Sequence, residues 1–108
     1  DIAIAQTALL VNSEFVENHH TIYKNIIKYY KSSSNWVNNN PTKAAQLIVK
    51  YEILPNEHVA FNSIPRSNLE FLEAYPIKKQ ITKYLQIFFE MNPDIIGGKI
   101  PDDGFFAH

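Results

Sequence analysis

The feature that most constrains this chain is an asparagine–proline junction, Asn38-Asn39-Asn40-Pro41, inside the helix-forming stretch Thr21–Leu54. Proline cannot donate the N–H bond that an inner helical turn requires, but at the first helical position that donor has no partner anyway. Asparagine directly before it is a favourable N-cap residue. The sequence therefore predicts two helices that meet here, one ending near Asn38 and the next beginning at Pro41.

Both helices are amphipathic, so each must pack one face against something. The first is predicted to run from Asn18–His20 to about Asn38, with Lys24, Lys28 and Lys31 on its polar side. Its apolar face is expected to hold Ile22, Tyr23, Ile26, Tyr30, Ser33 and Val37. In the second helix, the apolar residues at three- and four-residue spacing are Ala44, Leu47, Ile48 and Tyr51.

Prolines also delimit two further helices. Pro55 opens a short helix over 55–64, which offers Val59, Ala60 and Ile64 to a core, and Pro65 is expected to close it. Pro76 begins the last strong helix, which Asn92-Pro93 ends. The apolar stripe of that helix is Ile77, Ile81, Leu85 and Phe88.

Two segments are predicted as short strands. Thr7–Val11 lies at the end of the apolar run 2–11, and a helical turn capped by Ser13 follows it. Ser67–Leu72 alternates in part between apolar and polar residues. The expected fold class is thus an α/β fragment, mostly α, with about four helices and one or two short strands. A strand buried on both faces belongs to a larger sheet, and this chain offers few partner strands.

The C-terminal tail is rich in turn residues, Gly97-Gly98 and then Pro101-Asp102-Asp103-Gly104. Two aromatic residues, Phe105 and Phe106, follow these turns. Large aromatic side chains rarely stay in a free end, because burying them contributes strongly to stability. We expect both rings to dock on the rest of the chain.

Composition limits the choice of function. The 108 residues suffice for a single domain, 1–108. Ten basic and eleven acidic side chains are interspersed, so the basic stripe of a nucleic-acid-binding protein is missing. No apolar run approaches the length of a membrane span. The chain opens on Asp1 without an initiator Met, and we expect it to be an excised or processed piece of something longer.

No catalytic or metal-binding pattern emerges. Adjacent His19 and His20 point about 100° apart on a helix, unlike the i, i+4 spacing of a shared metal site. Gly97-Gly98 lacks the spacing of a phosphate-binding loop, and Asp102-Asp103 before a glycine is typical of a solvated turn. We therefore expect no metal, no cofactor and no enzymatic activity.

The one arginine, Arg66, is the strongest candidate for contact with an anionic ligand, because its planar guanidinium can bind in a bidentate fashion. The commoner role for such a residue is structural: a salt bridge to Glu70 or Glu73, or a cap on helix carbonyls.

Four stretches together resemble the C-terminal third of an ABC-transporter solute-binding protein of the nitrate, sulfonate and thiamine-precursor type. They are the apolar segment leading into TALLVNSEFVENHH, then NWVNNNPTKAAQLIVKYEIL, AFNSIPRSNLEF and the tail IIGGKIPDDGFF. The tail is the most specific of the four. The chain departs from the family at His19-His20, where the family usually has a proline, and at Glu52, where it usually has a glycine.

The resemblance implies a two-lobed periplasmic-binding-protein type II architecture that captures a small solute outside the membrane and delivers it to an ABC permease. Its location would be extracytoplasmic, periplasmic or lipid-anchored at the cell surface. Ligand contacts within this piece are expected from Gln6, Thr7 and Arg66, most others lying upstream of Asp1. Alone, the piece is expected to form a homodimer or swapped assembly in which Ala5–Val11 pairs with its copy or with another chain's strand. The alternative is a small, self-folding helical interaction or regulatory domain.

Overall fold

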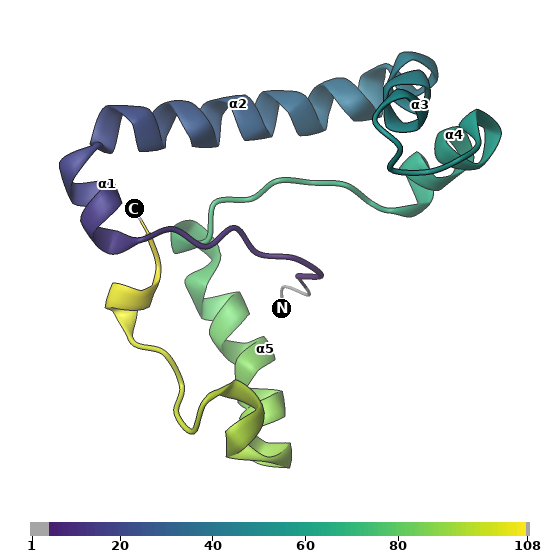
Figure 1. Cartoon of the computed structure of the whole chain (residues 1–108). Coiled ribbons are helices and arrows are strands. Elements are labelled where there is room, and N and C mark those ends of the chain that lie inside the picture. The colour runs from purple at the N-terminus through teal and green to yellow at the C-terminus, as the bar shows by residue number, and fades with distance from the viewer. Residues whose placement is uncertain (1–4, 108) are drawn as a thin grey trace. The chain divides into compact units, whose positions relative to one another are not determined.

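The computed structural model describes residues 5–107, which form two compact units. The long-helix unit spans residues 20–71, and the tail unit combines residues 5–19 with residues 72–107. Figure 1 labels the helices of both units. Most of the described chain is helical, which confirms the predicted helix-rich composition, and no strand occurs in residues 5–107.

The predicted junction at Pro41 is confirmed in the long-helix unit. α2 spans His20–Asn39, and α3 spans Pro41–Lys50 with proline at its first position. Asn40 occupies the N-cap position, but its side chain makes no capping bond. Its Nδ2 instead donates to the carbonyl of Trp36, at 3.0 Å, and so closes the end of α2.

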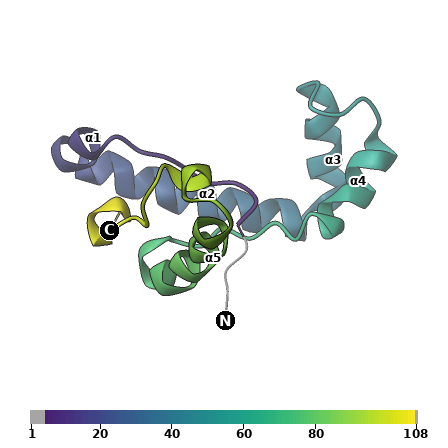
Figure 2. The same ribbon diagram turned by 90° about the horizontal axis from the view of Figure 1, so that it is seen from below.

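The packed face of α2 is rotated from the predicted one. Tyr23 and Ser34 are buried, whereas Ile22 and Ile26 remain 52% and 41% exposed. Tyr23 belongs to the predicted apolar face, whereas Ser34 does not. The segment after α4 runs back along α2 (Figure 1, Figure 2) and brings the Phe71 ring to 5.1 Å from that of Tyr30, which itself remains 48% exposed.

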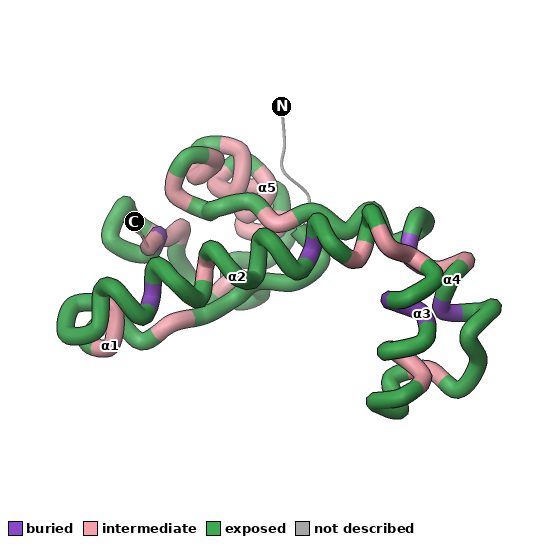
Figure 3. Tube along the Cα trace, turned by 90° about the horizontal axis from the view of Figure 1, so that it is seen from above, coloured by how far each residue is buried: buried purple, intermediate pink, exposed green. Residues whose placement is uncertain are grey.

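α3 and α4 pack against each other as a hairpin. α4 spans Glu57–Arg66 and begins at Asn56, whose side chain accepts a hydrogen bond from the Val59 N–H at 3.1 Å. Figure 3 shows the buried stretches of these two helices. The residues buried there are mostly small, which lets the backbones approach closely: Ala44, Ala45, Ala60 and Ile64. Leu47, Tyr51 and Val59, which were predicted for packed faces, are exposed.

The turn between α3 and α4 depends on a left-handed residue. Glu52 has a φ of +59°, a conformation in which an L residue brings its Cβ close to a carbonyl oxygen. The turn returns the Ile53 N–H to the Ile48 carbonyl at 2.9 Å, the bond that typifies a Schellman C-cap. Glycine is the residue that usually occupies this position.

Pro65 does not close α4, contrary to the prediction. It lies inside the last turn, and the helix continues to Arg66. A proline there removes only the bond to the carbonyl four residues earlier, that of Phe61, whose side chain is itself exposed. Ser67 then caps the end, because its hydroxyl donates to the Ser63 carbonyl at 2.8 Å.

The strand predicted over Ser67–Leu72 is absent. Asn68 has a φ of +47°, which interrupts an extended run. Two contacts with α2 fix the segment instead: the Tyr30–Phe71 ring pair and a 2.7 Å hydrogen bond from Asn38 Nδ2 to the Leu69 carbonyl. Without a second strand beside it, its backbone has no ladder to join.

The strand predicted over Thr7–Val11 is also absent. Residues 7–11 have no regular secondary structure, and the large side chains Leu9 and Leu10 are 46% and 80% exposed. The physical reason is the same, since no described segment pairs with them. Residues 1–4, the beginning of the same apolar run, lie outside the described residues.

The tail unit follows the predicted helix boundaries more closely. α1 spans Ser13–Asn18, although its cap is Asn12 rather than Ser13. The short 3-10 helix η1, Tyr75–Ile77, leads into α5, Lys78–Met91, whose predicted apolar stripe is half-buried. Asn92 ends α5, and the chain continues through η2, Pro93–Ile96, and η3, Asp103–Phe105.

Candidate functional site

The three residues predicted to contact a ligand belong to different units. Gln6 and Thr7 are exposed neighbours in the extended segment of the tail unit. Arg66 is the last residue of α4 in the long-helix unit and is exposed as well. Within a single unit, the structure brings together only Gln6 and Thr7, and it does so through their adjacency in sequence.

Arg66 does not form the structural salt bridge that was the commoner expectation. Within residues 5–107, no ion pair joins it to Glu70 or Glu73. Its position in the last turn of α4 is favourable, because a cation there interacts with the negative end of the helix dipole. The guanidinium therefore faces solvent, where an anion can reach it.

A polar hollow lies next to Arg66 in the long-helix unit, with a volume of about 440 Å³. Its lining combines three amide side chains with one carboxylate: Asn35, Asn38, Pro65, Asn68, Leu69 and Glu70. Arg66 follows Pro65 in the chain but does not line the hollow. The one charged group of the lining, Glu70, favours a cation, whereas Arg66 favours an anion. These residues therefore do not make a consistent site for one anionic solute.

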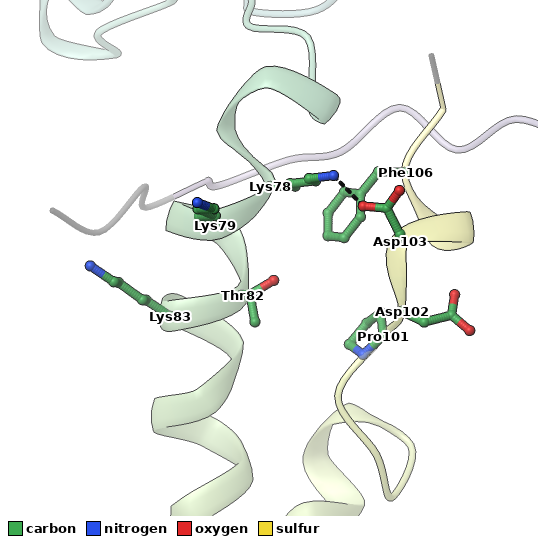
Figure 4. Close-up of a pocket in the computed structure, with 8 residues that line it drawn as sticks. All are labelled: Lys78, Lys79, Thr82, Lys83, Pro101, Asp102, Asp103 and Phe106. Atoms are coloured by element: carbon green, nitrogen blue, oxygen red, sulfur yellow. Dashed lines mark hydrogen bonds and ion pairs between the residues drawn. The ribbon is translucent and has the colours of Figure 1, made fainter.

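The second hollow, about 360 Å³ in volume, lies in the tail unit between α5 and the C-terminal tail (Figure 4). A compact polar cluster lies at one end of it. Lys78 Nζ forms a hydrogen-bonded ion pair with Asp103 and lies 4.1 Å from the centre of the Tyr75 ring. The Tyr75 hydroxyl donates to the other carboxylate oxygen of Asp103 at 3.4 Å. Three residues from two segments thus hold the tail at the beginning of α5.

The electrostatics of this cluster favour the charged lysine. The Asp103 carboxylate accepts a hydrogen bond from the Lys78 ammonium and thereby raises the pKa of Lys78 above its ordinary value of 10.5. Tyr75 acts in the same direction. Lys79 and Lys83 also line the hollow, but in Figure 4 their amines extend away from Pro101 and Asp103. The hollow is therefore better suited to contact between α5 and the tail than to holding an anion.

The tail residues meet the sequence predictions in part. Phe106 is 5% exposed and docks as predicted, whereas Phe105 is 61% exposed and does not. Asp102 makes the expected turn, because its Oδ1 accepts a hydrogen bond from the Gly104 N–H at 3.1 Å. Asp103 was predicted to be part of a solvated turn, but it binds Lys78. Sequence reasoning missed this pair because 25 residues separate its members. The one hint was the expectation that the tail docks.

Residues 5–107 contain neither a candidate metal cluster nor a candidate membrane span. These residues contain no cluster of three or more His, Cys, Asp or Glu side chains that could hold a metal ion. None of their helices combines the length and hydrophobicity that crossing a membrane requires. No family model, curated protein or solved structure matches this chain.

Proposed function

We propose that this chain is the C-terminal segment of the solute-binding component of an ABC importer, of the nitrate, sulfonate and thiamine-precursor type. The observation that carries the proposal is how little apolar surface the chain buries by itself. Six hydrophobic residues are buried within residues 5–107, and three of them are alanines. Large apolar side chains on α2 to α5 remain exposed, including Ile22, Leu47, Val59 and Ile87.

Helices of this kind fit a role as the outer layer of a sheet that the rest of the protein supplies. An amphipathic helix is stable only where its apolar stripe is covered. The extended segment 6–11 fits the same role, because a strand that enters such a sheet has unpaired backbone groups when the sheet is missing. In this proposal, α2 to α5 cover one lobe of a two-lobed receptor and the segment 6–11 pairs within its sheet.

Two local conformations also support the family resemblance. Glu52 stands where the family usually has glycine, and its φ of +59° is one that glycine adopts at little cost. His20 stands at the family's usual proline region and is the first residue of α2, a position that proline favours. Glu52 thus keeps a backbone conformation that glycine prefers, and His20 occupies a helix position that proline favours.

The proposed activity is recognition and delivery, not catalysis. A small solute would bind in the cleft between two lobes outside the membrane, and lobe closure would present it to the permease. Gln6, Thr7 and Arg66 are the residues of this chain that we propose to reach the solute. Nitrate and sulfonates are anions, which matches the exposed guanidinium of Arg66.

The direct test uses the longer parent protein that the proposal requires. Native mass spectrometry with nitrate, an alkanesulfonate and an aminopyrimidine should detect a one-to-one adduct with one of them. Cell fractionation should find the parent protein outside the cytoplasmic membrane. A parent protein that binds none of the three solutes and remains in the cytoplasm would refute the proposal.

The role of Arg66 is tested separately by calorimetry on the same protein. Arg66→Ala should weaken the binding of an anionic solute about tenfold to a hundredfold, the usual loss for a charge-assisted hydrogen bond. Lys50→Ala is the matched control, because Lys50 is also an exposed cation in the last turn of a helix, α3. Equal affinity of the two variants would remove Arg66 from the site while leaving the function intact.

The behaviour of the 108-residue chain alone separates the transport proposal from the alternative, a self-folding helical interaction domain. Under the transport proposal its apolar faces are exposed, so the chain should self-associate, and we propose a homodimer in which residues 5–11 pair with their copy. Light scattering at micromolar concentration measures this directly. A compact monomer with one cooperative unfolding transition would favour the alternative.

A further inference from the structure

The C-terminal end of the tail unit, residues 99–107, is referred to below as the strap. Three features determine how it is held: two glycines before it, an ion pair with α5 and one buried aromatic ring. The chain leaves η2 through Gly97 and Gly98, with φ values of +82° and +91°. A Cβ at either glycine would meet no atom within 4 Å, so backbone conformation rather than crowding requires glycine here. Two successive glycines give the strap a wide range of directions at low cost.

The latch is the ion pair between Lys78 and Asp103, together with the Tyr75 ring and hydroxyl (Figure 4). It is accessible to water, because the side chain of Lys78 is 30% exposed and that of Asp103 is 61% exposed. Salt screens ion pairs at such exposed sites effectively. Salt can therefore weaken the latch directly.

The elements on either side of the strap do not depend on the latch. η2 is held by its own bonds, from the Asp94 N–H to the Asn92 side chain and from the Gly98 N–H to the Pro93 carbonyl. α5 ends in a backbone bond from the Asn92 N–H to the Phe88 carbonyl. Breaking the contact at Asp103 leaves all of these bonds in place.

We propose that the strap opens as a unit about Gly97-Gly98 when the Lys78–Asp103 latch is broken, while α5 and η2 stay folded. The Phe106 ring is the anchor that closes it again, because it is buried in the closed state. Opening exposes Phe106 and the side of α5 around Thr82. This inference does not depend on the proposed transport function.

The test is NMR on the complete 108-residue chain. Strap opening is reported by the aromatic ¹³C signals of Phe106, because its ring is buried in the closed state and exposed in the open state. The N–H groups of Gly104, Phe105 and Phe106 are bonded within the strap, so they stay bonded when it opens as a unit. The N–H groups of Gly97 and Gly98 report on η2. Asp103→Asn removes the charge of the latch. Asp102→Asn removes the same charge one residue earlier and keeps an oxygen that accepts from Gly104.

Asp103→Asn should raise the open-to-closed ratio of the strap, read from the Phe106 signals, about threefold to fivefold, the usual range for an exposed ion pair, without changing amide exchange at Gly97 and Gly98. Sodium chloride at about 0.5 M should produce a similar increase of this ratio in the unaltered chain and little further increase in Asp103→Asn. Asp102→Asn should leave the ratio within about twofold of that in the unaltered chain.

Three results would overturn the proposal. Faster amide exchange at Gly97 and Gly98, equal to the rise in the open-to-closed ratio of the strap, would mean that the tail unit unfolds together. Equal effects of Asp102→Asn and Asp103→Asn on the ratio would mean that overall charge, and not the latch, controls the strap. Unchanged Phe106 signals in Asp103→Asn at low salt would mean that the ion pair does not hold the strap closed.

Discussion

Replacing Glu52 with glycine should stabilise the hairpin formed by α3 and α4. An L residue in the left-handed region costs roughly 1–2 kcal/mol, and Glu52 is held there at φ +59° by the turn that returns the chain to Ile48. Glycine avoids this cost, but it also gains conformational freedom in the unfolded chain, which offsets about 0.4–1 kcal/mol. The net expectation is an increase of about 0.5–1 kcal/mol in the free energy of unfolding.

Circular dichroism at 222 nm during thermal and urea unfolding measures this change. For a chain of this size, the expected rise in the midpoint temperature is roughly 2–8 °C. Glu52→Ala is the matched control, because alanine keeps the Cβ and thus the strain but removes a negative charge from the unfavourable C-terminal end of α3. Its effect should stay within about 0.5 kcal/mol. An increase as large for alanine as for glycine would refute the argument from strain and assign the effect to charge.

Three further predictions concern the latch, the anchor and a helix cap. Asp103 raises the pKa of Lys78 above 10.5, so the latch contributes fully to stability below pH 10.5, and this contribution is lost as pH rises through the raised pKa. Arginine stays charged at higher pH, so Lys78→Arg should keep the strap closed at about pH 11. The aromatic ¹³C signals of Phe106 would report this. Phe106→Ala should lower the free energy of unfolding by about 2–3 kcal/mol in urea titrations, and Phe105→Ala by under about 0.5 kcal/mol, because only the first ring is buried. Asn56→Ala should lower the free energy of unfolding by about 1 kcal/mol, because it removes the N-cap of α4. Asn40→Ala should lower it by less, because the Asn40 side chain makes no capping bond at α3. Thermal unfolding followed by circular dichroism compares the two variants.

Helix positions followed from the sequence because their signals are local. Pro41 and Asn92 act through their own backbone and side chain, so no knowledge of the rest of the fold is needed to place a helix boundary there. Pro65 was predicted to close α4, but the helix continues to Arg66. The free-energy cost of a proline inside a helix depends on the hydrogen bond that it removes, and here that bond, to the Phe61 carbonyl, lies at an exposed helix end.

The strands and the packed face of α2 could not be predicted because they depend on distant partners. An alternating segment such as 67–72 forms a strand only beside another strand, and here α2 is its neighbour instead. The latch has the same character, since nothing near Lys78 in sequence indicates Asp103. For Arg66, contacts with residues near in sequence were predicted but are not formed: no salt bridge joins it to Glu70 or Glu73 within the described residues.

The hydrogen bond from Asn38 to Leu69 has a consequence for the order of folding. It joins residues 31 apart, and the α3–α4 hairpin lies entirely within the loop that it closes. Closing a long flexible loop loses chain entropy, and a hairpin that has already formed shortens the part still free to move. The return of the chain onto α2 should therefore be a late kinetic event, so that truncating Asn38 accelerates unfolding much more than it slows folding.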